Sequence, residues 1–73
     1  MMTLSRNQKR VKTYVVVDEL GQWAGDPFKA SRCDAERVGR EQLAARDKVK
    51  PEHKLLRAWL RVFGSQRATL QLR

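Results

Sequence analysis

The sequence predicts an α+β fold of order ββαββ, in which one α-helix packs on a small antiparallel sheet made of two hairpins. Polar and apolar residues alternate near both ends of the chain, which is typical of strands with one buried face. Between these segments, a capping residue precedes apolar residues that recur with helical spacing. A chain of 73 residues can bury one small core. We therefore expect a single domain over 11–73, preceded by a flexible basic N-terminal arm over 1–10.

The first hairpin is predicted from composition and turn chemistry. Lys12–Val17 is rich in β-branched and aromatic residues, which favour strands. Glu19-Leu20-Gly21 suits a three-residue loop, in which Gly21 takes the positive φ that other residues disfavour. A short return strand over Gln22-Trp23-Ala24 then completes the hairpin.

Two aromatic residues flank the end of this hairpin. Its register sets Trp23 opposite Val17, and Gly25-Asp26-Pro27 then breaks the return strand just before Phe28. Aromatic side chains carry the largest apolar areas available to a small core. We therefore expect Trp23 and Phe28 to close the core between the hairpin and the helix.

The helix is predicted over Arg32–Arg46. Ser31 can cap a free backbone N–H of the first turn, and Asp34 complements the positive end of the helix dipole. Gly39 costs about 1 kcal/mol relative to alanine inside a helix, which close packing against a sheet would offset. One broad face is expected to be buried, and its residues are Ala35, Val38, Gly39, Gln42, Leu43 and Ala45.

The segment 54–63 admits two interpretations. As a helix it would begin near Pro51, place its large apolar residues on one stripe and end at Gly64. As a strand it would form a hairpin with 68–72, joined by a three-residue loop over Gly64-Ser65-Gln66. We favour the hairpin, because 68–72 alternates cleanly and needs a partner strand.

The predicted register of this second hairpin separates its residues onto two faces. The pairs on the buried face are Val62 with Ala68, Leu60 with Leu70, and Ala58 with Leu72. The pairs on the opposite face are Arg61 with Thr69, Trp59 with Gln71, Arg57 with Arg73, and Phe63 with Arg67. Apolar pairs fall together without adjustment, as a half-buried sheet requires.

The charge distribution indicates an anionic partner. Sixteen Lys and Arg against eight Asp and Glu give a net charge of +8, and every acidic residue falls within 18–52. The segments before and after that range supply the whole surplus. We therefore predict that both segments contribute to one functional surface. Their basic residues are Arg6, Lys9, Arg10, Lys12, Lys54, Arg57, Arg61, Arg67 and Arg73.

The candidate partner-binding site combines this charge with the outward face of the second hairpin. Alternate residues on a strand lie roughly 6.6 Å apart, so arginines there can bind successive carboxylates or phosphates. Trp59, between two arginines, can anchor a protein partner or stack on a base. In the alternative interpretation, Trp59 and Phe63 cover a second small core and the arginines are only solvated. The candidate residues are Arg6, Lys9, Arg10, Arg57, Trp59, Arg61, Arg67 and Arg73.

No group of residues predicts catalysis or metal binding. Cys33 and His53 are the only cysteine and histidine, so they provide neither an internal disulfide nor a zinc site. A nucleophile would need His53 as its base, a third orienting group and a pocket that excludes water. A domain of this size leaves little volume for such a pocket. We expect a non-enzymatic protein without a cofactor or a metal.

Over its whole length the chain resembles the small, basic RNA polymerase-binding regulators that lytic phages, such as those of Xanthomonas, make against host transcription. The resemblance rests on the length, the opening MMTLSRNQKRVKTYVVVDELGQW and the Arg- and Ala-rich composition. It implies a transcription regulator that binds host bacterial RNA polymerase at the N-terminal segment of β′, near the β flap. It also implies that binding opposes σ-factor engagement, inhibits initiation and promotes antitermination.

Two other functions fit the same basic surface. One is a small nucleic-acid-binding protein, DNA-binding or ribosome-associated, that uses the basic arm and the Arg-rich hairpin face. The other is an inhibitor of an acidic host protein. No apolar run is long enough to span a bilayer or to serve as a signal peptide. We therefore expect a cytoplasmic protein of the host bacterial cell with no membrane partner, and we expect it to be a monomer.

Overall fold

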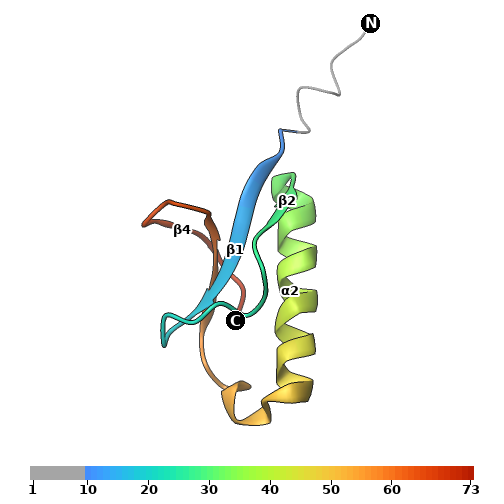
Figure 1. The fold of residues 1–73 in the computed structure, drawn as a ribbon, viewed down its shortest axis with the longest axis vertical. Helices are drawn as coiled ribbons and strands as arrows, with labels where there is room; N and C mark the ends of the chain where they lie inside the picture. Colours follow the sequence, from blue (N-terminus) through green and yellow to red (C-terminus); the bar gives the residue numbers. More distant parts are fainter. Residues whose placement is uncertain (1–9) are drawn as a thin grey trace, which may run out of the picture.

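The computed structural model describes residues 10–73 and confirms the predicted α+β fold of order ββαββ (Figure 1). Its elements are β1 (Lys12–Asp18), β2 (Phe28–Ala30), α2 (Arg32–Val49), the short 3₁₀ helix η1 (Pro51–His53), β3 (Ala58–Val62) and β4 (Ala68–Gln71). Most of the predicted arm, with Arg6 and Lys9, lies outside the described residues. Neither helix within 10–73 is long and apolar enough to cross a membrane.

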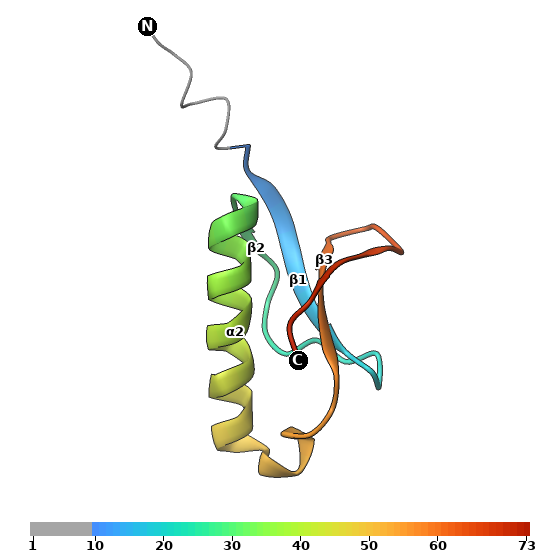
Figure 2. The ribbon, with the colours of Figure 1, turned by 180° about the vertical axis from the view of Figure 1, so that it is seen from behind.

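The strands form one antiparallel sheet in the order β2-β1-β3-β4, and α2 runs along one of its faces (Figures 1 and 2). The central strand β1 pairs with β3 from Tyr14 opposite Val62 to Asp18 opposite Ala58. This pairing joins the two hairpins, although the helix separates them in sequence. It brings 12–17 beside 58–62, two strand segments that contain no acidic residue.

The core lies between the sheet and α2. Val16 and Leu60 face each other on the central strands and are fully buried. A Cβ on Gly39 would lie 2.8 Å from Leu72 Cδ1 and 3.2 Å from Val16 Cγ2. The helix therefore approaches the sheet closely at this glycine, as predicted. The buried core residues are Tyr14, Val16, Ala35, Leu43, Ala58, Leu60 and Leu72.

The helix begins as predicted and ends later. The Ser31 hydroxyl accepts a hydrogen bond of 3.4 Å from the Asp34 N–H, which confirms the predicted cap. The helix continues past Arg46 to Val49, because Pro51 is the next residue that lacks a backbone N–H. Within the predicted buried face, three residues spaced by four are fully packed; they are Ala35, Gly39 and Leu43.

Ala45, which the sequence predicts to be buried, is exposed. Successive residues of an α-helix are separated by about 100° around its axis. The packed stripe of Ala35, Gly39 and Leu43 is narrow, and Ala45 falls well outside it. The buried face of the helix is therefore narrower on this side than predicted.

The predicted return strand over 22–24 is present only as a single antiparallel bridge. The turn before it is confirmed, since Gly21 has a φ of 81° and Val17 pairs with Trp23. That pairing is an isolated bridge, and strand β2 begins only after Pro27. Proline has no N–H to donate to a neighbouring strand, so the ladder with β1 can resume only beyond it.

The second hairpin is confirmed, with corrections to its register. The predicted pairs of Trp59 with Gln71 and of Leu60 with Leu70 are present. A β-bulge then follows, so that Arg61 lies opposite Ala68 rather than Thr69, and Ala68 is no longer opposite Val62. The inserted residue bends β4 relative to β3.

The connection between β3 and β4 is also longer than predicted, spanning 63–67 instead of three residues. Within it, the Arg67 N–H donates to the Ser65 hydroxyl at 3.1 Å. Phe63 does not face Arg67, because its N–H donates to the Thr13 carbonyl of β1 at 2.8 Å. The bulge and the longer loop have a common effect, which is to turn the tip of the hairpin.

Candidate functional site

The face of the sheet that points away from α2 carries a second apolar layer. Val15 and Val17 project to this side, because they alternate with the core residues of β1. They are only 4% and 6% exposed, and they lie opposite Arg61 and Trp59 of β3. We call this surface the outer face, defined by Val15, Val17, Trp59, Arg61 and Phe63. The surface packed against α2 is the inner face.

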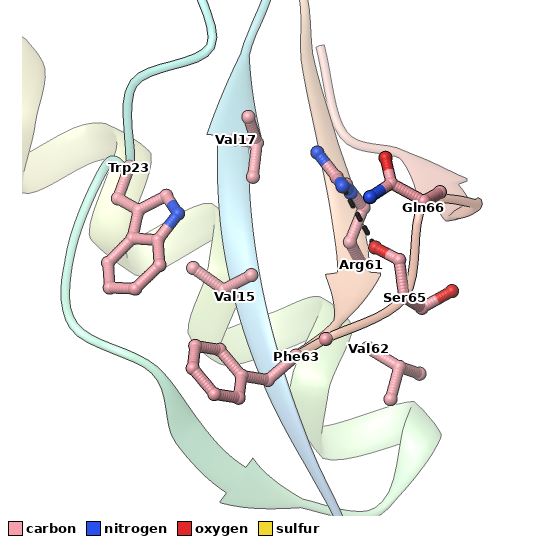
Figure 3. A pocket seen from close by; sticks show the side chains of 9 residues that line it. Val15, Val17, Trp23, Arg61, Val62, Phe63, Ser65 and Gln66 are labelled. Atoms are coloured by element: carbon pink, nitrogen blue, oxygen red, sulfur yellow. Dashed lines mark hydrogen bonds between the residues drawn. The ribbon is translucent and has the colours of Figure 1, made fainter.

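Two aromatic side chains cover the valines of the outer face. The rings of Trp23 and Phe63 meet edge to face, with centroids 5.8 Å apart and planes at 72°. Figure 3 shows both rings beside Val15 and Val17. Each aromatic residue is still 52% exposed. The apolar layer is therefore covered by side chains that keep half of their own surface in water.

The prediction that Trp23 closes the core is wrong, whereas Phe28 packs against the core as predicted. Residues directly opposite each other on paired strands project to the same face. The bridge between Trp23 and Val17 therefore places the indole on the outer face. The predicted register already contained this information, since Val17 and Val16 must point to opposite faces of the sheet.

A buried ion pair orders the turn that precedes Trp23. The Asp18 carboxylate is inaccessible to solvent and accepts hydrogen bonds of 2.9 Å from the N–H groups of Leu20 and Gln22. Arg46 of α2, itself almost buried, donates to the same carboxylate at 2.8 Å. Sequence reasoning missed this pair, because its members are distant in the chain and no local pattern connects them.

Arg61 reaches across the outer face from β3. Its Nη2 group donates to the Ser65 carbonyl at 2.8 Å, which directs the guanidinium toward the β3–β4 connection (Figure 3). Its Nε–H group is buried and has no acceptor among residues 10–73. A buried donor without an acceptor costs roughly 1–3 kcal/mol.

A hollow of about 150 Å³ opens beside Arg61, and we call it the aromatic cleft. Trp23 and Phe63 border it on one side, Arg61 and Gln66 border it on the other, and Val15 lies between them (Figure 3). Its walls therefore offer apolar surface and ring faces together with guanidinium and amide groups. Sequence reasoning missed Gln66 and Val15 as lining residues, because it assigned no tertiary role to either.

A second hollow, of about 330 Å³, lies on the other side of Arg61. Val17 and Trp59 supply its apolar surface, and Glu19, in the turn after β1, also borders it. Arg61 borders both hollows. Trp59 is thus on the outer face, as predicted. The second hollow also has one exposed acidic residue at its edge, Glu19, which the charge analysis of the sequence did not place near the candidate site.

Three of the predicted basic residues are exposed next to the ends of strands. Arg10 precedes β1, Arg67 lies in the β3–β4 connection, and Arg57 precedes β3. Arg57 is fixed through its backbone, since its N–H donates to Glu19 Oε1 at 2.8 Å and its carbonyl accepts from the Glu19 N–H at 3.0 Å. These contacts leave the Arg57 side chain in solvent.

Arg73 is not part of the outer face, so its predicted place opposite Arg57 is wrong. Its guanidinium forms an ion pair with Asp47 of α2 and donates to the carbonyls of His53 and Lys54. The backbone of Arg57 is hydrogen-bonded to Glu19, in the turn after β1, and not to Arg73. Arg73 therefore ties the end of the second hairpin to the helix, and a partner on the outer face would not meet it.

Within residues 10–73, no three His, Cys, Asp or Glu side chains lie close enough together to hold a metal ion. Cys33 is exposed at the start of α2. No protein-family model matches the chain, and comparisons with curated proteins and with solved structures gave no match. The chemistry available on the outer face is binding through apolar contact and charge-assisted hydrogen bonds.

Proposed function

We propose that this protein is a non-enzymatic transcription regulator that binds host bacterial RNA polymerase. On the resemblance described above, its contact is the N-terminal segment of β′ near the β flap. Binding there opposes σ-factor engagement, inhibits initiation and promotes antitermination. The resemblance supports the identity of the polymerase, and the outer face supports a function that depends on binding.

The observation that carries this proposal is the pairing of β1 with β3. It assembles an apolar layer, two exposed aromatic rings and Arg61 on one surface. Protein–protein interfaces have an apolar centre and a polar rim, and their cores are enriched in Trp, Phe and Arg. The outer face has this composition.

A nucleic-acid-binding protein is the second candidate, and the net charge of +8 favours it. Glu19, however, is exposed and borders the second hollow. A carboxylate at the edge of the site repels a phosphate backbone, whereas it can pair with a basic group of a protein. The mixed charge of the surface therefore favours a protein partner.

Capture of polymerase from bacterial lysate by the tagged full-length chain tests the proposal. We expect the β′ and β subunits to remain bound after nuclease treatment at about 150 mM salt, because a partly desolvated interface is screened less than phosphate contacts. Loss of all partners after nuclease treatment would contradict the proposal and favour the nucleic-acid-binding protein.

A pair of charge reversals locates the contact. Arg57→Glu reverses an exposed charge beside the outer face, and Arg32→Glu makes the same change on the exposed start of α2. Both variants have the same net charge, so nonspecific attraction falls equally. We expect only Arg57→Glu to weaken polymerase capture and to restore σ-dependent initiation in a purified transcription reaction.

A further inference from the structure

We propose that the outer face binds an extended segment of its protein partner, with two bulky apolar side chains at alternate positions and carboxylates beside them. One apolar side chain occupies the aromatic cleft, and the other occupies the second hollow. This inference rests on the proposed function in that the partner is a protein, and it adds the chemistry of the segment that is bound.

The size and lining of the aromatic cleft indicate its occupant. An apolar cavity of about 150 Å³ accommodates a benzene molecule, and the aromatic cleft has this volume. Trp23, Phe63 and Val15 give it an apolar wall. It therefore fits a single phenylalanine- or leucine-sized side chain. Burial of such a side chain against two rings is the usual form of an interface anchor.

The position of the second hollow indicates an extended backbone. Along β3, Phe63 borders the first hollow and Trp59 borders the second, with Arg61 common to both. The hollows thus follow one another along the strands, about two strand residues apart, which corresponds to roughly 6.6 Å. Alternate side chains of an extended segment have the same spacing and point to the same side.

Arg61 is placed to bind the backbone or a carboxylate of that segment. It borders both hollows, and its Nη2 group donates to the Ser65 carbonyl at 2.8 Å. This hydrogen bond holds the guanidinium between the hollows and leaves other N–H groups of its fork for a carbonyl or carboxylate of a chain that crosses from one hollow to the other.

Charge complementarity determines what flanks the apolar residues. Arg57 and Arg67 are exposed on either side of the two hollows, at the start of β3 and in the β3–β4 connection. Carboxylates next to the apolar pair would meet these arginines. A single-stranded nucleic acid also has flat bases and negative charge, but it carries a phosphate at every nucleotide, so one would cross the second hollow beside Glu19. The carboxylates of the proposed segment lie only on either side of its apolar pair, next to the arginines. The edge-to-face rings also offer no parallel stacking platform for bases.

The test is an NMR titration of the ¹⁵N-labelled full-length protein with three probes. The first is the peptide Asp-Glu-Phe-Thr-Leu-Glu-Asp. The second is Asp-Glu-Ser-Thr-Ser-Glu-Asp, which has the same charge without the apolar pair. The third is a short oligothymidylate. We expect saturable binding of the first peptide, with shifts concentrated at residues 15, 17 and 61–66 and at the Trp23 indole N–H.

Variants separate the cleft from general charge. Trp23→Ala and Phe63→Ala should weaken binding of the first peptide by at least about tenfold, and Leu55→Ala, at a residue 94% exposed away from the cleft, should leave it unchanged. Arg61→Lys keeps the charge but removes the planar fork of N–H donors, and it should weaken binding several-fold. Thermal midpoints measured alongside identify any variant that has lost its fold, and Arg61→Lys then serves as the deciding variant.

Several outcomes would overturn this inference. They are equal binding of the two peptides, tighter binding of the oligothymidylate, and no saturable peptide binding up to millimolar concentration. Polymerase capture distinguishes this failure from that of the proposed function. If Trp23→Ala captured polymerase like the unaltered protein, the segment inference would fail and the proposed function would stand. If the peptide bound at the cleft but the protein did not capture polymerase, the segment inference would stand and the proposed function would fail.

Discussion

The two faces of the sheet bury their valines almost equally well but cover them in different ways. Val16 on the inner face has no exposed surface, and Val15, the next residue along, has 4%. On the inner face the cover is a complete helix, which approaches closely at Gly39. On the outer face the cover consists of Trp23 and Phe63, which are each half exposed.

This difference shows that burial of a residue does not reveal the role of the surface above it. A helix that covers a core is held by its own hydrogen bonds and by many contacts, so its loss is equivalent to unfolding. Two aromatic side chains can move through rotamer changes without disturbing the sheet below them. The inner face is therefore expected to govern stability, and the outer face to govern binding.

The largest expected effect is on the inner face, at Leu60. This side chain is fully buried in the core cluster, and replacement by alanine leaves a cavity that a small domain cannot close. We expect Leu60→Ala to lower the free energy of unfolding by about 4 kcal/mol. Urea denaturation measures this change, with the exposed Leu55→Ala as the control expected within about 0.5 kcal/mol. Equal effects of the two variants would contradict the placement of β3.

The next largest effect is expected at the ion pair that joins the turn after β1 to the helix. Arg46→Met removes the cation but keeps much of the side-chain volume, which leaves the buried Asp18 with backbone donors only. We expect a loss of about 3 kcal/mol in the free energy of unfolding. Arg37→Met, on the same helix, breaks an exposed pair with Glu41 and should cost no more than about 0.5 kcal/mol.

The two valines allow the most direct test of the comparison, because they are the same residue type on adjacent positions of β1. Val16→Ala opens a cavity between sheet and helix, and we expect it to lower the free energy of unfolding by about 2–3 kcal/mol. Val15→Ala should cost about 1 kcal/mol, since the half-exposed rings above it can settle into the space. Equal losses in urea denaturation would mean that the outer cover is as rigid as the inner one.

Local signals in the sequence were sufficient to predict the fold class and the order of its elements, whereas the pairing of β1 with β3 was not predicted. The Ser31 cap, the positive φ of Gly21 and the alternation of 68–72 each depend on residues close together in the chain. The pairing of Leu60 with Leu70 follows from the same alternation. These features were predicted correctly because the residues that favour each of them lie close together in the sequence.

The site was predicted only in part, because its geometry depends on contacts between distant segments. Trp59 and Arg61 were placed correctly from hairpin register. The bulge at Thr69 has no distinctive residue to mark it, and the association of Asp18 with Arg46 links a turn to a helix far along the chain. Trp23 is different, since its register with Val17 was predicted and its face could have been deduced from it.

Small effects on stability are expected from two arginines that the sequence placed together and the structure separates. Arg73 bonds to Asp47 and to backbone carbonyls in a partly buried position, so Arg73→Ala should lower the free energy of unfolding by about 1–2 kcal/mol. The Arg57 side chain is in solvent, and Arg57→Ala should change stability by less than about 0.5 kcal/mol.

For binding, the order of the two effects should be reversed, with the larger effect at Arg57 and the smaller at Arg73. Arg57 lies beside the outer face, where an exposed charge accelerates encounter with an acidic surface more than it slows release. Stopped-flow association with purified polymerase should therefore be slower for Arg57→Ala at low salt, and the difference should shrink as salt screens the charge. Arg73→Ala should associate at the rate of the unaltered protein, because its guanidinium is occupied by the helix. Slower association of Arg73→Ala alone would move the binding surface from the outer face to the end of the molecule where Arg73 meets α2.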